Sequence, residues 1–132
     1  MARILIVEDE ILVACEMEAI LQDNGHDSLG IAPDLASAQR FFESHIDLAL
    51  VDLNLRDGLT GPEIGRGLSQ AGVPVVFVTA NPAQLEGGVA GTIGVLTKPT
   101  DERTLMAAVD YALEWRSGRP SSPPPPAMRL FG

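Results

Sequence analysis

Short runs of apolar, largely β-branched residues alternate with stretches of helical character along most of the chain, and this alternation limits the folds that it can adopt. The runs are residues 3–7, 28–32, 48–51, 75–79 and 94–97. They are apolar on both faces, which is typical of parallel strands covered by helices on both sides. The sequence therefore predicts an α/β class, doubly wound domain with a five-stranded parallel sheet.

The helices expected after the first, second, third and fifth of these strands span residues 10–24, 35–45, 62–71 and 101–116. Asp34 stands where a side chain can cap the second helix, and Pro62 falls in the first turn of the third. The stretch between the fourth and fifth strands contains three glycines, each of which costs a helix about 1 kcal/mol relative to alanine. We expect a short or mobile helix over residues 81–91.

Proline dominates the last part of the sequence. Residues 117–132 include half of the ten prolines, and four of them are consecutive at 123–126. Consecutive prolines favour extended polyproline II. The 132 residues fit one domain of ordinary size. We therefore divide the chain into a domain of residues 1–116 and a proline-rich tail of residues 117–132, which we expect to be disordered, with no packed structure before its ending at 128–131.

Charge and cysteine content exclude several classes of function. Eighteen acidic and nine basic residues give a net charge of −9, which repels nucleic acid and anionic lipid, so we expect no direct DNA binding. The longest mostly apolar run, residues 71–80, is too short to span a bilayer, so we expect no membrane insertion. Cys15 is the only cysteine, which fits a reducing cytoplasm.

Polar side chains follow the strands at the edge where their carboxyl ends meet. Glu8 and Asp9 follow the first strand, Asp52 follows the third, Thr79 ends the fourth, and Lys98, the only lysine, follows the fifth. Ligands bind beyond this edge in open α/β sheets. Each residue alone has an ordinary structural explanation, such as a helix cap or a solvated charge. Together, carboxylates about 5 Å apart repel by roughly 3 kcal/mol, which a divalent cation would offset.

Magnesium suits this group, because it prefers oxygen ligands and is commonly shared between one or two carboxylates and a phosphate. An aspartate carboxylate is a known nucleophile for covalent phosphorylation. The cation, Lys98 and the Thr79 hydroxyl could together neutralise and orient a phosphoryl group at Asp52.

Four motifs in order resemble the receiver domain of two-component response regulators. They are Ile-Leu-Ile-Val-Glu-Asp-Glu at 4–10, Leu-Ala-Leu-Val-Asp-Leu-Asn-Leu at 48–55, Val-Phe-Val-Thr-Ala at 76–80 and Leu-Thr-Lys-Pro at 96–99. Each motif is weak alone, but four in this order are a strong signal that covers residues 3–116. The resemblance implies a flavodoxin-like fold with strand order 2-1-3-4-5.

The resemblance also implies roles for the site residues. Asp52 would be the phosphoacceptor. Magnesium would be held by Glu8, Asp9, Asp52 and the backbone carbonyl of Asn54. Thr79 and Lys98 would contact the phosphoryl group. The donor would be a phosphohistidine of a sensor histidine kinase or a histidine phosphotransfer protein.

Two further features follow from the resemblance at the fifth strand. The peptide bond between Lys98 and Pro99 is expected to be cis. Val95, three residues before the lysine, stands where the family usually carries tyrosine or phenylalanine. The usual switch between threonine and an aromatic side chain is therefore in doubt for this chain.

These features predict a stand-alone cytoplasmic phospho-receiver in a histidine–aspartate phosphorelay, whose magnesium-dependent phosphorylation switches binding to a downstream protein. It would be no enzyme beyond catalysing its own phosphorylation and dephosphorylation. Residues 57–62 and 74–79 resemble a subgroup of single-domain receivers from alphaproteobacterial stress signalling.

The alternative is a receiver-fold module that binds proteins without phosphorylation. A flavodoxin-like nucleotide binder fits poorly, because residues 8–10 would repel its phosphate. The chain also fits a cysteine phosphatase poorly, because it lacks the arginine that such a site requires six residues after Cys15.

Overall fold

A six-stranded sheet forms the centre of the protein in a computed structural model that describes residues 2–98, 100–118, 120 and 122–131. The strand order is β2-β1-β3-β4-β5-β6, and the first five strands in this order are parallel while β6 is antiparallel to β5. The strands are β1 (Arg3–Val7), β2 (Asp27–Ala32), β3 (Leu48–Val51), β4 (Val75–Thr79), β5 (Gly94–Thr97) and β6 (Met128–Leu130). The predicted α/β fold and the order 2-1-3-4-5 are confirmed, with one strand added.

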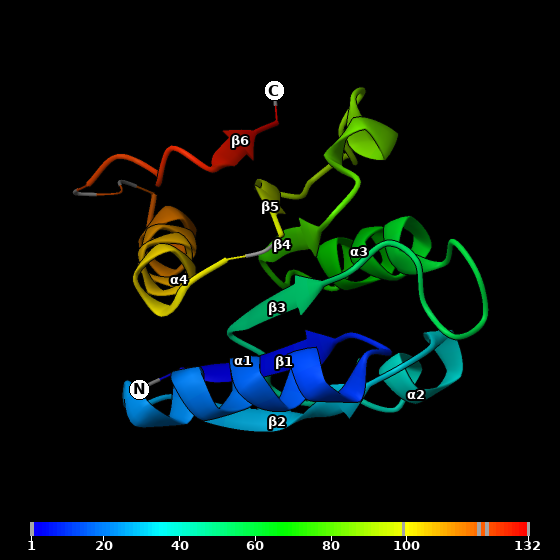
Figure 1. The fold of residues 1–132 in the computed structure, drawn as a ribbon. Coiled ribbons are helices and arrows are strands. Elements are labelled where there is room, and N and C mark those ends of the chain that lie inside the picture. The colour runs from blue at the N-terminus through cyan, green and yellow to red at the C-terminus, as the bar shows by residue number, and fades with distance from the viewer. Residues whose placement is uncertain (1, 99, 119, 121, 132) are drawn as a thin grey trace.

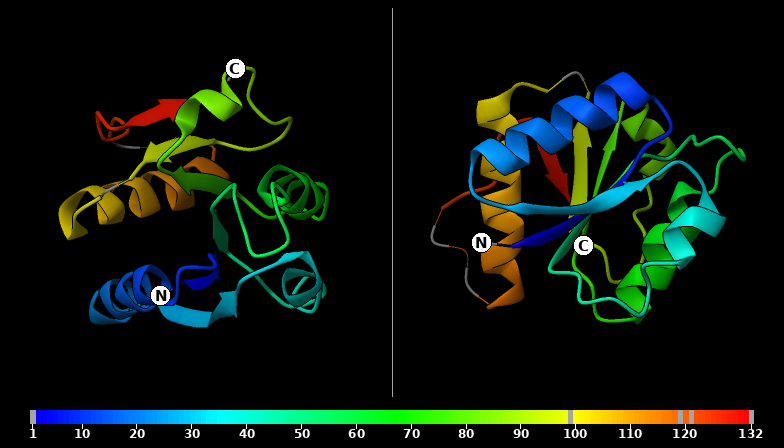
Figure 2. Two further views of the ribbon diagram at one scale, coloured as in Figure 1. Left: turned by 45° about the vertical axis from the view of Figure 1, so that its right-hand side comes forward. Right: turned by 90° about the horizontal axis from the view of Figure 1, so that it is seen from below.

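Helices cover both faces of the sheet, as Figures 1 and 2 show. They are α1 (Ile11–Asp23), α2 (Leu35–Gln39), α3 (Gly61–Gln70) and α4 (Glu102–Arg116), with a 3-10 helix η1 (Pro82–Leu85) after β4. Helices α1 and α4 pack on the face that carries Ile4, Ile6 and Leu50, and α2 and α3 pack on the face of Leu5 and Val51. Both faces of the central strands are therefore buried, which explains their unbroken apolar runs.

The second helix is shorter than predicted. We expected residues 35–45 to be helical, but α2 ends at Gln39 and the chain continues as turns closed by tighter hydrogen bonds, such as Phe41 N–H to the Ala38 carbonyl at 3.0 Å. The predicted cap is confirmed, because Asp34 accepts a hydrogen bond from Ser37 N–H at 2.8 Å. Phe41 lies against Gly30, so the turns carry an aromatic ring onto the β2 surface.

The tail differs from the expectation at its ending. We expected residues 117–132 to be disordered, whereas the structure pairs Met128–Leu130 with β5 and buries Met128 and Pro125. The reason is that β5 would otherwise be an edge strand with unpaired backbone groups, which an extended segment can satisfy. Among the described residues, none of the helices is long and apolar enough to cross a membrane.

Candidate functional site

The carboxyl ends of β1, β3, β4 and β5 bring the predicted site residues to one edge of the sheet. Backbone hydrogen bonds fix the first two of these ends: Glu8 N–H donates to the Ala32 carbonyl at 3.0 Å, and Asp52 N–H donates to the Val7 carbonyl at 2.9 Å. The ends of β4 and β5 are joined in the same way, because Lys98 N–H donates to the Thr79 carbonyl at 2.8 Å. The sheet hydrogen bonding thus extends to the residues that carry the chemistry.

Lys98 binds two carboxylates at once. Its Nζ donates to Asp52 Oδ2 at 2.9 Å and also to Glu8 Oε1. Only 14% of the Lys98 side chain is exposed, and Glu8 and Asp52 are buried. Although burial alone lowers the pKa of Lys98, the hydrogen bonds to Glu8 and Asp52 raise it above its ordinary value. The lysine is therefore held charged between the two carboxylates.

Glu8 is the most deeply buried acid of the site. Its Oε2 accepts backbone N–H bonds from Asp9 at 3.1 Å and Glu10 at 3.2 Å. Burial is the largest influence and raises the pKa of Glu8 to about 7, which the bond from Lys98 opposes and the Asp52 charge reinforces. The carboxylate form of Glu8 is thus costly without further positive charge at the site.

Three carboxylates form a cluster that suits a divalent cation. Glu8, Asp9 and Asp52 each offer an oxygen, and these oxygens lie within 4.8 Å of one another. Asp9 is exposed whereas the other two are buried, so one side of the cluster is open to water. All-oxygen ligation with room for water is the arrangement that magnesium prefers. The donor set therefore fits the predicted cofactor.

Asp52 is oriented from both sides of its carboxylate. Leu53 N–H donates to Oδ1 at 2.7 Å, while Oδ2 accepts the bond from Lys98. The side chain is only 10% exposed. Asp52 is therefore a buried carboxylate of fixed orientation within the acidic cluster.

Thr79 and Asn54 line the same edge. The Thr79 hydroxyl is buried and accepts the N–H of Asn81 at 3.1 Å, which ties it to the start of the η1 segment. The exposed Asn54 amide donates to Gln84 Oε1 at 3.2 Å. Ligation by the Asn54 carbonyl stays a prediction. The predicted cis peptide bond falls on Pro99, which lies outside the described residues.

Val95 lies in the buried cluster beneath η1 and pairs with Phe77 of β4. Phe131 of the tail is one of the aromatic side chains that pack against this cluster, and its ring centroid lies 6.3 Å from that of Phe77. Strand β5 itself supplies no aromatic ring, because its sequence, Gly-Val-Leu-Thr, contains none.

Gly61 is a site residue that the sequence reasoning missed. A Cβ atom there would lie 2.0 Å from the Asp52 carbonyl oxygen and 2.5 Å from Leu53 Cα. The first turn of α3 therefore packs directly against the backbone of Asp52, which only glycine allows. The Gly-Pro pair that begins α3 was a signal, but we used it only to place the helix.

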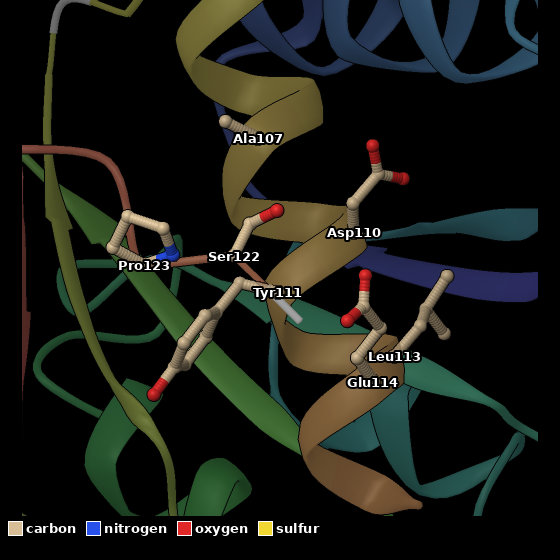
Figure 3. Close-up of a pocket in the computed structure, with 7 residues that line it drawn as sticks. All are labelled: Ala107, Asp110, Tyr111, Leu113, Glu114, Ser122 and Pro123. Atoms are coloured by element: carbon tan, nitrogen blue, oxygen red, sulfur yellow. The ribbon is translucent and has the colours of Figure 1, made fainter. Parts of the chain in front are cut away.

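Two hollows lie outside the acidic cluster. One, of about 380 Å³, opens beside Lys98 between α1 and α4 and is lined by Met17, Ile20 and Leu105 among others. The other, of about 360 Å³, lies on α4 far from the strand ends; Figure 3 shows Tyr111 on the helix with Ser122 and Pro123 of the tail at the same hollow. No predicted site residue lines the second hollow.

Comparison with known proteins agrees with this geometry. Residues 4–110 match the response regulator receiver domain. The chain is 32% identical over 115 residues to the phyllosphere-induced regulator PhyR of Methylorubrum extorquens, covering 84% of this chain and 43% of that protein. It is 30% identical to the sensory transduction protein RegX3 of Mycobacterium tuberculosis, covering 86% of this chain and 51% of that protein. The chain thus spans about half the length of these relatives.

Solved structures give the same result. The receiver domain of the Erythrobacter litoralis PhyR response regulator superposes with a TM-score of 0.73 at 30% identity, covering 92% of this chain and 94% of that one. A Bartonella quintana PhyR variant, described as an anti-anti-sigma factor, superposes with a TM-score of 0.77 at 27% identity, covering 89% of this chain and 50% of that one. PhyR proteins are thus among its relatives in both sequence and structure, and the chain belongs to the response regulator receiver domain family.

Proposed function

We propose that the protein is a phospho-receiver in which Asp52 accepts a phosphoryl group from a phosphohistidine. The observation that supports this proposal best is the setting of Asp52: a buried carboxylate held by Leu53 N–H and Lys98, beside the open acidic cluster. A structural aspartate at a turn needs neither a buried lysine nor a second buried acid beside it.

The chemistry requires little from the protein beyond placement and charge. An Asp52 oxygen forms a bond to phosphorus while the bond from phosphorus to the histidine nitrogen breaks, and the electron pair leaves with the nitrogen. Lys98 already lies at Asp52 Oδ2 and would balance the phosphoryl charge. The Thr79 hydroxyl would offer a further hydrogen bond.

Magnesium would be held by Glu8, Asp9 and Asp52, with the Asn54 carbonyl as a further ligand. When bound it supplies positive charge that offsets the charge of the transferring phosphoryl group. The chain's own catalysis would extend only to its own phosphorylation and dephosphorylation.

The surroundings of the cluster offer exposed apolar side chains to a docking protein. Ile11 is 62% exposed and Leu12 is 83% exposed at the start of α1, directly after the acidic residues. The hollow between α1 and α4, which is lined by apolar and charged side chains, opens beside Lys98. We propose that a sensor histidine kinase or histidine phosphotransfer protein docks there, that the cytoplasm is the site of action, and that a downstream protein reads the phosphorylated form, as the similarity to PhyR suggests.

Intact-mass measurement after incubation with acetyl phosphate tests this function. We expect a gain of one phosphoryl group that requires magnesium and disappears in Asp52→Asn. Asp57→Asn, which changes an exposed acid of the next loop, is the matched control and should label as the wild type does. Binding of a partner by an Asp52→Asn protein as tight as by the phosphorylated wild type would instead favour a module that works without phosphorylation.

A further inference from the structure

Strand β6 closes an edge of the sheet that would otherwise be open. It pairs with β5 in an antiparallel register that sets Leu130 opposite Gly94 and Met128 opposite Leu96, and Phe131 N–H donates to the Ile93 carbonyl at 3.0 Å. An unpaired strand edge is a template for any extended chain. The β5 edge is thus able to bind an antiparallel segment through backbone hydrogen bonds.

Gly94 shows that β5 is shaped for a close second backbone. A Cβ atom at this position would lie 2.4 Å from the Arg129 carbonyl oxygen and 3.1 Å from Leu130 Cα, and its three nearest atoms all belong to β6. Glycine weakens the interior of a strand and often marks the close approach of another backbone. The glycine is therefore explained by a strand in the β6 position.

The η1 side of this edge holds an aromatic ring and an arginine. Phe131 packs near Phe77, and a Cβ atom on Gly88 would lie 3.2 Å from the Cγ atom of Phe131. Arg129 donates from Nη2 to the Leu85 carbonyl at 2.9 Å, and its guanidinium carbon lies 5.3 Å from the Phe131 ring centroid. Arg129 and Phe131 are two residues apart and so share one face of the strand. On this side the edge thus holds an arginine and an aromatic residue two positions apart.

The chain's own strand is a short occupant at the edge of the sheet. Strand β6 has three residues, and although Met128 is buried, Leu130 is 42% exposed, and the four prolines at 123–126 offer no backbone N–H to lengthen the pairing. A short edge strand can open locally at a lower free-energy cost than the central strands of a sheet. In Figure 1 β6 lies on the outer margin of the sheet, and it pairs with β5 alone.

We propose that the β5 edge together with residues 85–88 is a docking groove for an extended peptide segment of a partner protein, which carries an arginine and an aromatic residue two positions apart, and that β6 is its resting occupant. Charge agrees with a basic segment, because residues 1–116 hold all eighteen acids and only seven of the nine bases. The proposal does not depend on phosphorylation of Asp52.

A peptide titration on the full chain tests the groove. The double variant Arg129→Ala/Phe131→Ala loosens β6, and the probe is a synthetic peptide with the sequence of residues 122–132. We expect saturable NMR shifts at residues 85–88 and 93–96. The wild type should bind the peptide at least about tenfold more weakly, because its own strand competes at a high effective concentration. Leu130→Ala, which changes an exposed side chain of the same strand, is the control and should behave as the wild type.

Two further variants make the result specific. A peptide with alanine in place of its arginine and phenylalanine should not bind. Adding Gly94→Ala to the double variant should abolish binding, because the new Cβ occupies the path of the strand. A folded double variant that takes up no peptide, or binding that survives Gly94→Ala, would overturn the proposal.

Hydrogen exchange on the unmodified chain gives an answer even where the double variant does not fold. The amide of Phe131, which donates to the Ile93 carbonyl, should exchange at least about tenfold faster than the amides of β1 and β3, because β6 opens locally. Exchange only with global unfolding would show that β6 is a fixed part of the sheet and would overturn the proposal. A concentration-dependent dimer of the wild type that Gly94→Ala abolishes would assign the groove to a second copy and overturn the assignment to a partner.

Discussion

Lys98 holds Glu8 and Asp52 together through its ammonium group. Both acids are buried, and the ammonium reaches both of them. A magnesium ion at the cluster would therefore compete with Lys98 for the same oxygens. At the scale of single residues, we expect the lysine to stabilise the metal-free fold and to weaken magnesium binding.

Replacing Lys98 with alanine separates these two effects. In metal-free buffer we expect the free energy of unfolding to fall by about 3 kcal/mol, the cost typical of leaving a buried charge without its partner. We also expect magnesium to bind more tightly than in the wild type, and to raise the melting temperature further, because the carboxylates have lost a competing cation. Denaturant unfolding and calorimetric titration measure the two quantities.

Arg116→Ala is the matched control for this experiment, because it removes an arginine from an exposed ion pair with Asp47, which precedes β3 at the end of the strand opposite to the site. Exposed pairs contribute little to stability, so this variant should resemble the wild type in both measurements. Weaker magnesium binding by Lys98→Ala would show that the lysine supports the metal site rather than competing with it.

At the scale of elements, helix α3 approaches the site through Gly61. Gly61→Ala places a Cβ against the Asp52 carbonyl and the Leu53 backbone, which cannot move without shifting the site. We expect a clear loss of stability, of about 1–3 kcal/mol as for other overpacked positions, and slower uptake of phosphate from acetyl phosphate. Gly87→Ala is the control, because nothing lies within 4 Å of its added Cβ. Equal stability and labelling of the two variants would contradict this account of α3.

The cap of α2 gives a prediction on pH. Hydrogen bonds from Arg56 and then from Ser37 lower the pKa of Asp34 to about 2, from an ordinary value of 3.8. A lowered pKa in the folded state means that the carboxylate stabilises the fold above pH 4 and loses this effect as the pH falls toward 2. Asp34→Ala should therefore lower the melting temperature at pH 6, and the difference from wild type should shrink below pH 4.

Asp34→Asn distinguishes the cap from the charge. Its side-chain oxygen still accepts the Ser37 N–H, so it should lower the melting temperature less than alanine does. Thermal unfolding from pH 3 to pH 6 measures both variants. A gap between Asp34→Ala and wild type that stays constant over this range would mean that the ionised carboxylate contributes nothing.

The elements that could be predicted from the sequence are those with a strong local pattern. The bounds of β1, β3, β4 and β5 match the prediction, because each is a short, largely buried apolar run. The convergence of Glu8, Asp52 and Lys98 followed from the geometry of parallel strands. The end of α2 could not be predicted, because its helical pattern continues through Phe41 while tertiary packing draws that ring onto Gly30.

At the scale of the whole molecule, the contacts of β6 were beyond reach of sequence reasoning. Three residues after a proline run show no periodicity, and their pairing partner lies more than thirty residues away in β5. Gly94 and Gly88 read as ordinary loop or strand glycines until Phe131 and the Arg129 backbone are placed beside them. The closed edge is therefore a property of the assembled fold.

We expect phosphorylation to change the conformation of residues 80–95. The Asn81 N–H donates a hydrogen bond to the Thr79 hydroxyl. A phosphoryl group at Asp52 would add charge and strong acceptors that compete for this hydroxyl. We expect hydrogen exchange in residues 80–95 to change more on phosphorylation than anywhere outside the site loops. A change confined to α1 would place the responding surface on the opposite face of the sheet.

The central claim, that Asp52 itself carries the phosphoryl group, is tested most directly by locating the acyl phosphate. Borohydride reduces a phosphorylated aspartate to homoserine, which tandem mass spectrometry of the digested protein assigns to one position. After treatment with acetyl phosphate and magnesium, we predict homoserine at position 52 and unchanged aspartate at Asp9 and Asp57, with no homoserine when magnesium is chelated. Homoserine at position 9 or 57 in place of position 52 would contradict the account.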